Sequence, residues 1–254
     1  MEPWSPAWKQ AQLDAMHEAW SSCQGCQLHE TRNKVVFGEG NPDADLMFIS
    51  EGPGAQEDKT GVPFSAREGN AGELLNMMFD TVGIDRREVY IQNIVACRPP
   101  DNRDPIAVEK DACLPRVHEV IYIVDPLIIV TLGKYALTAL VKGRSWSIEA
   151  EHGKLFSSPS PDERVTGERN GVEIEGRVFP RKGETKAVHR LEYDLIPLFH
   201  PAYILRVDSY DKKTGQFAAG GVAHRTLDDL GVVLDRLHQL KDKHNHVTRI
   251  LERI

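Results

Sequence analysis

The feature that most constrains the fold is an alternation of short apolar runs with longer segments of helical spacing. The runs have the length of buried strands, and a helical pattern follows each of them. They cover residues 46–49, 89–96, 127–133 and 195–199. Strands that alternate with helices form a parallel sheet with helices on both faces. The sequence therefore predicts an α/β fold, a three-layer α/β/α arrangement with a central, mostly parallel four-stranded sheet.

Length and composition predict a single domain. The chain has 254 residues, of which 41% are hydrophobic, and this is enough to bury one substantial core. At about residues 145–193 the alternation gives way to charged and glycine-rich pieces, which predict an inserted excursion of hairpins or loops. We therefore expect residues 1–254 to form one domain, with this excursion as an insertion outside its core.

The loop after the first apolar run predicts a ligand site. It begins with the sequence EGPG at residues 51–54, and glycine lets a backbone come close to a ligand. Phe64, in the turn before the next helix, could lie against a flat ring. Ligands of open α/β sheets bind at the carboxyl ends of the strands. The alternative is a plain strand-to-helix turn, and neither a dinucleotide fingerprint nor a P-loop pattern occurs in the chain.

Two further polar residues belong to the same expected edge of the sheet. Asn93 lies near the carboxyl end of the second apolar run, and a buried amide there either bonds to main chain or meets a ligand. The sequence leaves both alternatives open. His200 follows the fourth run directly and is fixed by Pro201, so it is better placed than an average histidine to reach a ligand.

Four cysteines predict a metal site. Cys23 and Cys26 form a C-x2-C pair, whereas fifteen residues separate Cys97 from Cys113. In an intracellular chain this usage favours metal binding over disulfides. The second pair is too wide for a zinc knuckle, while iron-sulfur clusters held by four thiolates tolerate mixed spacings. An iron-sulfur centre is therefore favoured over zinc, and buried free thiols are the remaining alternative.

Charge and hydropathy exclude some classes of protein. The formal net charge is −7, which argues against unselective coating of nucleic acid, so any nucleic-acid surface must be a local patch. No apolar run approaches the roughly 18 residues of a membrane span. No signal-peptide pattern opens the chain. We expect a soluble, cytoplasmic protein with no membrane partner.

In their joint order, these motifs resemble the family 4 uracil-DNA glycosylases, the iron-sulfur branch of the uracil-DNA glycosylase superfamily. The matching segments are CQGCQLHETRNKVVFGEGNPDADLMFISEGPGAQEDKTGVPF, VYIQNIVACRPPDNRDP with Cys113, IVTLG and LIPLFHPAYILR. The resemblance implies a uracil-DNA glycosylase-like fold and a monofunctional DNA glycosylase, a DNA-repair hydrolase. Such an enzyme removes uracil or a related modified base that is flipped out of DNA and leaves an abasic site. The implied partner is single- or double-stranded DNA, bound by a monomer.

The resemblance also implies roles for single residues around the base. It assigns Glu51 and Gly52 to the catalytic loop and Phe64 to stacking on the flipped base. It assigns Asn93 to the Watson-Crick edge of the base, and His200 to the carbonyl beside the glycosidic bond. It further implies a 4Fe-4S cluster, chiefly structural, whose ligands are Cys23, Cys26, Cys97 and Cys113.

The segment after His200 is expected to lie against DNA, where it could fill the gap that the flipped nucleotide leaves. The residues expected at this surface are Arg98, Arg103, Ala202, Leu205 and Arg206.

The chain departs from the family pattern at Ser50, where glycine is usual, and at Val62, where arginine is common. Three alternatives therefore stay open. The chain could excise a modified pyrimidine bulkier than uracil, or it could bind DNA through a glycosylase-like module without turnover. It could also be an iron-sulfur electron carrier or redox sensor, which needs the cysteines alone.

Overall fold

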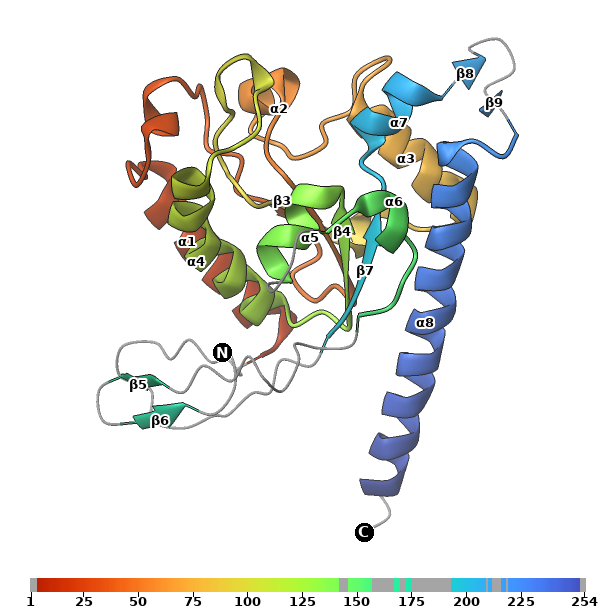
Figure 1. The fold of residues 1–254 in the computed structure, drawn as a ribbon. Coiled ribbons are helices and arrows are strands. Elements are labelled where there is room, and N and C mark those ends of the chain that lie inside the picture. The colour runs from red at the N-terminus through yellow and green to blue at the C-terminus, as the bar shows by residue number, and fades with distance from the viewer. Residues whose placement is uncertain are drawn as a thin grey trace.

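The fold is a central sheet covered by helices on both faces (Figure 1). The computed structural model describes residues 4–141, 146–156, 167–169, 172–174, 193–208, 210–211, 216–217 and 219–251. The main sheet has five strands in the order β1-β3-β2-β4-β7. These are β1 (Glu39–Gly40), β2 (Leu46–Ser50), β3 (Tyr90–Asn93), β4 (Ile128–Leu132) and β7 (Asp194–Leu198). The predicted α/β fold class is confirmed.

Parallel pairing joins the four strands that the sequence predicts. β2 pairs in parallel with β3 on one side and β4 on the other, and β4 pairs in parallel with β7. The predicted count of four strands missed β1, which runs antiparallel to β3 at the edge of the sheet. The two residues of β1, Glu39 and Gly40, are too few to show a hydrophobic period.

Helices follow the predicted order closely. Helical spacing in the sequence covers residues 6–20, 71–82, 106–124 and 135–141, and α1, α3, α4 and α5 match these ranges to within one residue at each end. In the last helix the apolar spacing is regular from Leu227 to Leu237, and the helix extends beyond it to Leu251. The described α-helices are α1 (Pro6–Ser21), α2 (Ala55–Thr60), α3 (Ala71–Val82), α4 (Ala107–Val124), α5 (Lys134–Leu140), α6 (Ile148–Glu151), α7 (Pro201–Val207) and α8 (Val222–Leu251).

Alternate residues of each central strand belong to two separate cores. Met47 and Ile49 of β2 pack with α1, α4 and α5, whereas Leu46 and Phe48 pack with α3, α7 and α8. Successive side chains of a strand point to opposite faces of the sheet. A strand covered on both faces is therefore apolar at every position, and this is why the four runs are continuous in the sequence.

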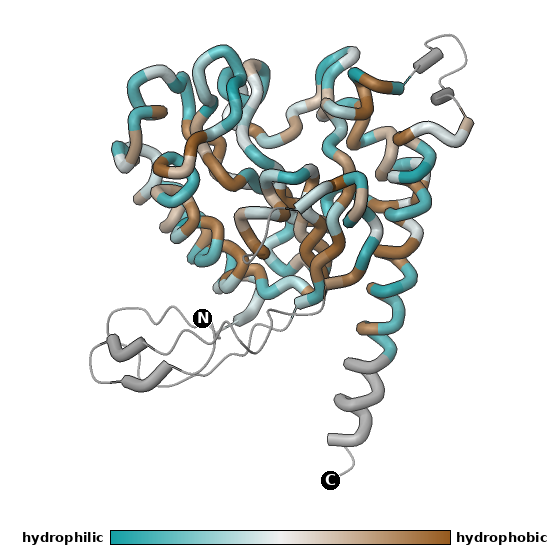
Figure 2. The backbone as a smooth tube through the Cα atoms, viewed as in Figure 1, coloured by the Kyte–Doolittle hydropathy of each residue, from teal (hydrophilic) through white to brown (hydrophobic). Residues whose placement is uncertain are grey.

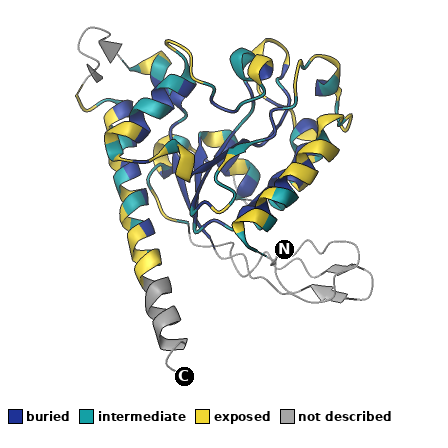
Figure 3. Cartoon of the chain, turned by 180° about the vertical axis from the view of Figure 1, so that it is seen from behind, coloured by how far each residue is buried: buried dark blue, intermediate teal, exposed yellow. Residues whose placement is uncertain are grey.

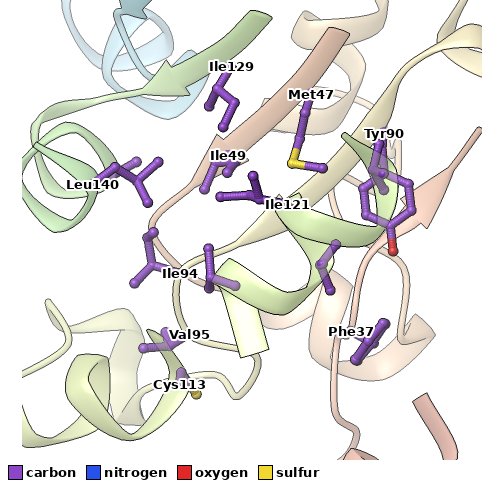
Figure 4. Close-up of a cluster of buried hydrophobic side chains, with 14 of the residues drawn as sticks. Phe37, Met47, Ile49, Tyr90, Ile94, Val95, Cys113, Ile121, Ile129 and Leu140 are labelled. Atoms are coloured by element: carbon purple, nitrogen blue, oxygen red, sulfur yellow. The ribbon is translucent and has the colours of Figure 1, made fainter. Parts of the chain in front are cut away.

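The figures show the same layering. Hydrophobic segments gather at the sheet in Figure 2, and the strands are buried while the outer sides of α4 and α8 are exposed in Figure 3. Figure 4 shows part of the first core, in which Ile121 of α4 lies close to Ile49 of β2.

The order of the strands creates a crevice at one end of the sheet. The connection from β2 to β3 packs α3 on one face, and the connection from β3 to β4 packs α4 on the other. Strand order therefore reverses between β2 and β4, and the segments that leave these strands run to opposite faces. Ligands of such sheets bind in the crevice at the carboxyl ends of the two strands.

The predicted excursion at residues 145–193 is described only in part. It contains α6 and one antiparallel pair, β5 (Gly167–Arg169) with β6 (Val172–Ile174), and much of the remainder lies outside the described residues. A second short pair, β8 (Tyr210–Asp211) with β9 (Gln216–Phe217), follows α7. The single-domain organisation stays a prediction. Within the described ranges, no helix is both long and apolar enough to cross a membrane.

Asp208 joins the end of α7 to the start of α8, and its removal is expected to destabilise the fold. Its carboxylate accepts the Val222 N–H at 3.1 Å and the Ala223 N–H at 2.6 Å. These are two of the donors that a helix start leaves without partners. Asp208→Ala should lower the free energy of unfolding by about 1 kcal/mol, measured by urea unfolding. Asp208→Asn keeps one acceptor oxygen and should lose less; equal losses would contradict the capping role.

Candidate active site

A cavity of about 470 Å³ opens at the carboxyl edge of the sheet, where the strand order reverses. Segments that follow β2, β4 and β7 form its walls, together with the loop before α4. Asn93, Arg98 and Leu205 are not among its lining residues. Of the residues singled out in the sequence, those that line it are Glu51, Gly52, Phe64, Arg103, His200, Ala202 and Arg206.

Phe64 is held in a strained conformation on one wall of this cavity. Its φ of 49° is in the left-handed region, which costs a bulky residue about 1–3 kcal/mol. The Glu57 carboxylate accepts the Phe64 N–H at 2.6 Å and the Gly54 N–H at 2.5 Å. Gly72 also makes room for this turn, because a Cβ there would lie 2.4 Å from the Phe64 carbonyl oxygen. The loop between α2 and α3 is thus fixed around the aromatic ring.

His200 lies opposite Phe64, with the two ring centroids 5.7 Å apart and the ring planes inclined by 35°. Its Nδ1 accepts the N–H of Ala202 at 3.0 Å, so the N-terminal turn of α7 fixes the ring. Its Nε2 lies 2.8 Å from the Ser50 hydroxyl oxygen. Since Nδ1 is an acceptor, the neutral ring carries its proton on Nε2 and donates it to Ser50.

Burial keeps this imidazole neutral. Desolvation and, to a smaller degree, the positive charge of Arg206 lower the pKa of His200 to about 4. At neutral pH the ring is therefore an uncharged hydrogen-bond donor at the cavity wall.

Asn93 ends β3, the strand next to β2 in the sheet. Its Cα pairs in register with that of Ser50, whose hydroxyl oxygen His200 contacts. Its side chain is buried, and among the described residues neither amide atom has a hydrogen-bond partner. Burial raises the pKa of the Glu57 carboxyl; the main-chain N–H groups of Gly54 and Phe64, and then the nearby Asn93 amide, act against that rise, although the Asn93 contact lacks hydrogen-bond geometry. The sequence left two alternatives for this amide, a hydrogen bond to main chain or contact with a ligand. Within the described ranges, no hydrogen bond from the amide to main chain is observed.

Glu51 follows β2 and carries a second perturbed group. Burial, then the negative charge of Asp104, raise the pKa of Glu51 to about 7, and Lys110 acts in the opposite direction. Its Oε1 is buried without a hydrogen-bond partner in the described part of the chain. Next to it, a Cβ at Gly52 would lie 2.7 Å from the Val95 side chain, so the position leaves no space for a larger residue.

Of the residues expected against DNA, Arg206 is exposed and lines the cavity, so its charge is available at the mouth. Lys134, which was not singled out in the sequence, is also exposed and lines the cavity. Arg103 instead forms a two-pronged ion pair with Glu109, at 2.6 and 2.9 Å. Leu205 is half-buried and packs against the core.

Arg98 and Ala202 complete the set of residues expected against DNA. The Arg98 Nε donates to the Asn102 side chain at 2.7 Å. Ala202 is half-buried and lines the cavity.

All four cysteines are free thiols, brought together from the loop after α1, the segment after β3, and α4. Burial raises the pKa of Cys97 to about 11, and both Cys113 and Cys26 add to that rise. Burial also raises the pKa of Cys26, with further contributions from Cys113 and Cys23. The sulfurs of all four cysteines therefore lie near one another.

The four cysteines supply the candidate ligands at this site. In the described ranges, no group of three or more histidine, cysteine or acidic side chains is arranged to hold a metal ion. Two sulfurs also accept hydrogen bonds, Cys23 from the Gly25 N–H and Cys97 from Arg32 Nη1, each at 3.4 Å. Four free cysteines are the type of ligand that the 4Fe-4S cluster implied by the resemblance requires, so the donor set fits that group.

Glu57 was not singled out in the sequence, although its carboxylate holds the loop that carries Phe64. A recognisable signal existed, because Gly54 and Glu57 have the spacing of a capping box at the start of α2. The Ser50–His200 contact had no such signal, since 150 residues separate its members.

The fold and cavity define a class of protein, the doubly wound α/β proteins with a ligand-binding cavity at the strand-order reversal. Residues 37–219 match the family model described as the uracil DNA glycosylase superfamily. Since this match covers well over half of its length, the chain belongs to the uracil-DNA glycosylase superfamily. The resemblance inferred from the motifs is confirmed.

Curated relatives agree with this assignment. The type-4 uracil-DNA glycosylase of Thermotoga maritima is 37% identical over 194 residues, which cover 76% of this chain and 83% of the relative. That of Sulfurisphaera tokodaii is also 37% identical and covers 76% of each chain. That of Pyrobaculum aerophilum is 32% identical over 217 residues, 83% of this chain and 95% of the relative.

The lowered pKa of His200 predicts a specific dependence of stability on pH. Unfolding restores the ordinary pKa of 6.5, so between pH 6.5 and about 4 the unfolded chain binds a proton that the folded chain does not. This contribution to stability is present above pH 6.5 and is lost as the pH falls. Wild type should therefore lose about 1–2 kcal/mol more than His200→Gln between pH 7 and 5, measured by urea unfolding. Parallel pH profiles for the two proteins would contradict a buried neutral imidazole.

Proposed function

We propose that this chain is a uracil-DNA glycosylase, which hydrolyses the N-glycosidic bond of uracil flipped out of DNA and leaves an abasic site. The observation that carries the proposal is a neutral His200 at the cavity wall that contacts Ser50, the register partner of Asn93, whose amide has no hydrogen-bond partner among the described residues. The names of the relatives support it. They do not favour a base bulkier than uracil, a DNA-binding module without turnover, or an electron carrier.

The first step is the extrusion of the base from the DNA stack, since an enzyme cannot reach the bond within a duplex. Phe64 lines the cavity with its ring toward His200, so an entering base can lie against it. Stacking on an aromatic ring is worth about 1–3 kcal/mol per base, which offsets part of the unstacking cost. The strained turn that Glu57 holds in place presents this ring before the base arrives.

Cleavage leaves negative charge on the departing base and positive charge on the sugar. The His200 Nε2–H is a fixed donor for the base carbonyl beside the glycosidic bond, and its attraction grows as that oxygen becomes anionic. It does not act by transferring a proton as an acid, because a group with a pKa of about 4 is protonated in only about one molecule in a thousand at pH 7.

Asn93 supplies the selection among bases. The Watson-Crick edge of uracil offers a donor next to an acceptor, which one amide can match with its oxygen and its nitrogen. Both amide atoms of Asn93 are buried without partners among the described residues. When the amide is oriented to match uracil, a base with the opposite pattern, such as cytosine, leaves both atoms unpaired, and sites built on such groups reject the wrong ligand strongly.

Glu51 is the candidate for positioning the attacking water and stabilising the positive sugar. With a pKa raised to about 7, a substantial fraction of this carboxyl is ionised at neutral pH. Its Oε1 faces no hydrogen-bond partner among the described residues, so a water can use it as an acceptor. Arg206 and Lys134, exposed at the cavity mouth, are the candidates for phosphate contacts with a DNA strand bound by the monomer.

We also propose that Cys23, Cys26, Cys97 and Cys113 hold a 4Fe-4S cluster. When bound, the cluster would tie the loop after α1 to α4 and to the end of β3, which is a structural task. No step of the base release uses it.

Two variants test the function on an oligonucleotide that contains one uracil. His200→Ala should reduce base release by about 10²–10³-fold, the effect of removing one donor to a developing anion. Asn93→Ala should lower the ratio of the rate of uracil release to the rate of cytosine release. His238→Ala, an exposed histidine on α8, is the matched control and should keep wild-type activity. Absence of uracil release by the wild-type protein would reject the proposal.

A pH profile tests the role of Glu51. If its ionised form is required, kcat/KM of the wild type should rise about tenfold per pH unit below its pKa of about 7 and level off above it. Glu51→Gln should lower the plateau and remove this acidic limb. Persistence of the limb in the variant would assign it to another group.

A further inference from the structure

Arg116 is a buried charge that the proposed reaction does not use. It lies within α4, three residues after Cys113, and is fully buried. Residues three apart on a helix share one face, so the guanidinium and the Cys113 thiol lie on the same side of α4. An arginine cannot give up its proton at any ordinary pH, so the side chain carries its charge into the core.

Its hydrogen-bond partners in the described part of the chain are all neutral. Nη1 donates to the Phe37 carbonyl oxygen at 2.7 Å and to Gln92 Oε1 at 3.2 Å. Nη2 donates to the carbonyl oxygens of Asn93 at 2.5 Å and Ile94 at 3.3 Å. Nε has no partner among the described residues.

A counter-charge is therefore needed. None of the ion pairs formed within the described ranges includes Arg116. A buried charge without an opposite charge is destabilising by several kcal/mol. The nearest groups that can become anionic include the cysteines. Cys113 lies one turn before Arg116 on α4, and Cys97 follows closely after Asn93 and Ile94, whose carbonyl oxygens the guanidinium contacts.

We propose that Arg116 is the buried counter-charge of the four-thiolate iron-sulfur centre and links that centre to the strand end that carries Asn93. The inference rests on the proposed cluster. Four thiolates outweigh the positive charge of a 4Fe-4S core, so the loaded centre is anionic. One guanidinium then attracts this centre and also holds the Asn93 and Ile94 carbonyls. Arg116 is thus a positioning residue for the base-reading amide.

The effect on the cluster can be tested by its reduction potential. A nearby positive charge favours the reduced, more negative cluster, so its removal should make the potential more negative. We expect Arg116→Met, which keeps the length and loses the charge, to shift the midpoint in that direction and to lose iron several-fold faster to a chelator. Arg116→Lys keeps the charge and should stay near the wild-type midpoint. The readouts are anaerobic redox titration by visible absorption and iron content per chain.

The outcomes separate this inference from the proposed cofactor. Absence of iron and sulfide in anaerobically purified wild type would reject the cluster itself, and this inference with it. If the wild type carries the cluster, two results would reject the role of Arg116 as counter-charge but not the cluster. One is an unchanged midpoint potential in Arg116→Met, and the other is an equal shift of the potential in Arg116→Lys.

A second measurement needs no variant and stands if Arg116→Met fails to fold. The Ile94 and Val95 amides donate to the carbonyls of Ser50 and Glu51 at 2.7 and 3.0 Å. Hydrogen exchange of these two amides should rise at least tenfold when a chelator strips the wild-type protein of iron, while the amides of β7 should change little. A uniform rise across the sheet would mean global loosening and would reject the link.

Discussion

The parallel register of β2, β3, β4 and β7 is the constraint on which the site depends. Ser50 pairs with Asn93, and Leu132 pairs with Leu198, so the strands end at a common edge. Residues far apart in the chain therefore emerge together, among them Glu51 after β2 and His200 after β7. A slip of one residue would turn every side chain of a strand to the opposite face. The two apolar cores prevent such a slip, because each face of the sheet is buried against its own helices.

Much of this arrangement could be predicted because it rests on local patterns. Continuous apolar runs revealed the four parallel strands, and helical spacing revealed the helices between them. Features that depend on distant contacts could not be predicted in this way. The Arg103 guanidinium, expected near DNA, is engaged by Glu109, and the burial of Arg116 among neutral carbonyls is visible only in three dimensions. The function of Glu57 depends on the Phe64 N–H, seven residues further along a folded loop.

One physical cause acts on both titratable groups of the candidate site. Desolvation disfavours the charged form of either residue, so it lowers the pKa of His200 and raises that of Glu51. At neutral pH the histidine is uncharged and the carboxyl is only partly ionised. The wall that His200 and Glu51 form therefore carries little fixed charge, whereas Arg206 and Lys134 carry positive charge at the mouth of the cavity.

The Ser50 hydroxyl accepts the hydrogen bond from His200 that a ligand oxygen in the cavity would need. In the proposed reaction, an incoming carbonyl oxygen would replace a hydroxyl that already accepts the imidazole proton, and the exchange of one neutral acceptor for another would bring almost no net affinity. The balance changes once the oxygen gains negative charge, since an anion outcompetes serine for the same donor. The contact with Ser50 would therefore weaken binding of the uncleaved base. The hydrogen bond from His200 would then stabilise mainly the transition state, in which the glycosidic bond breaks.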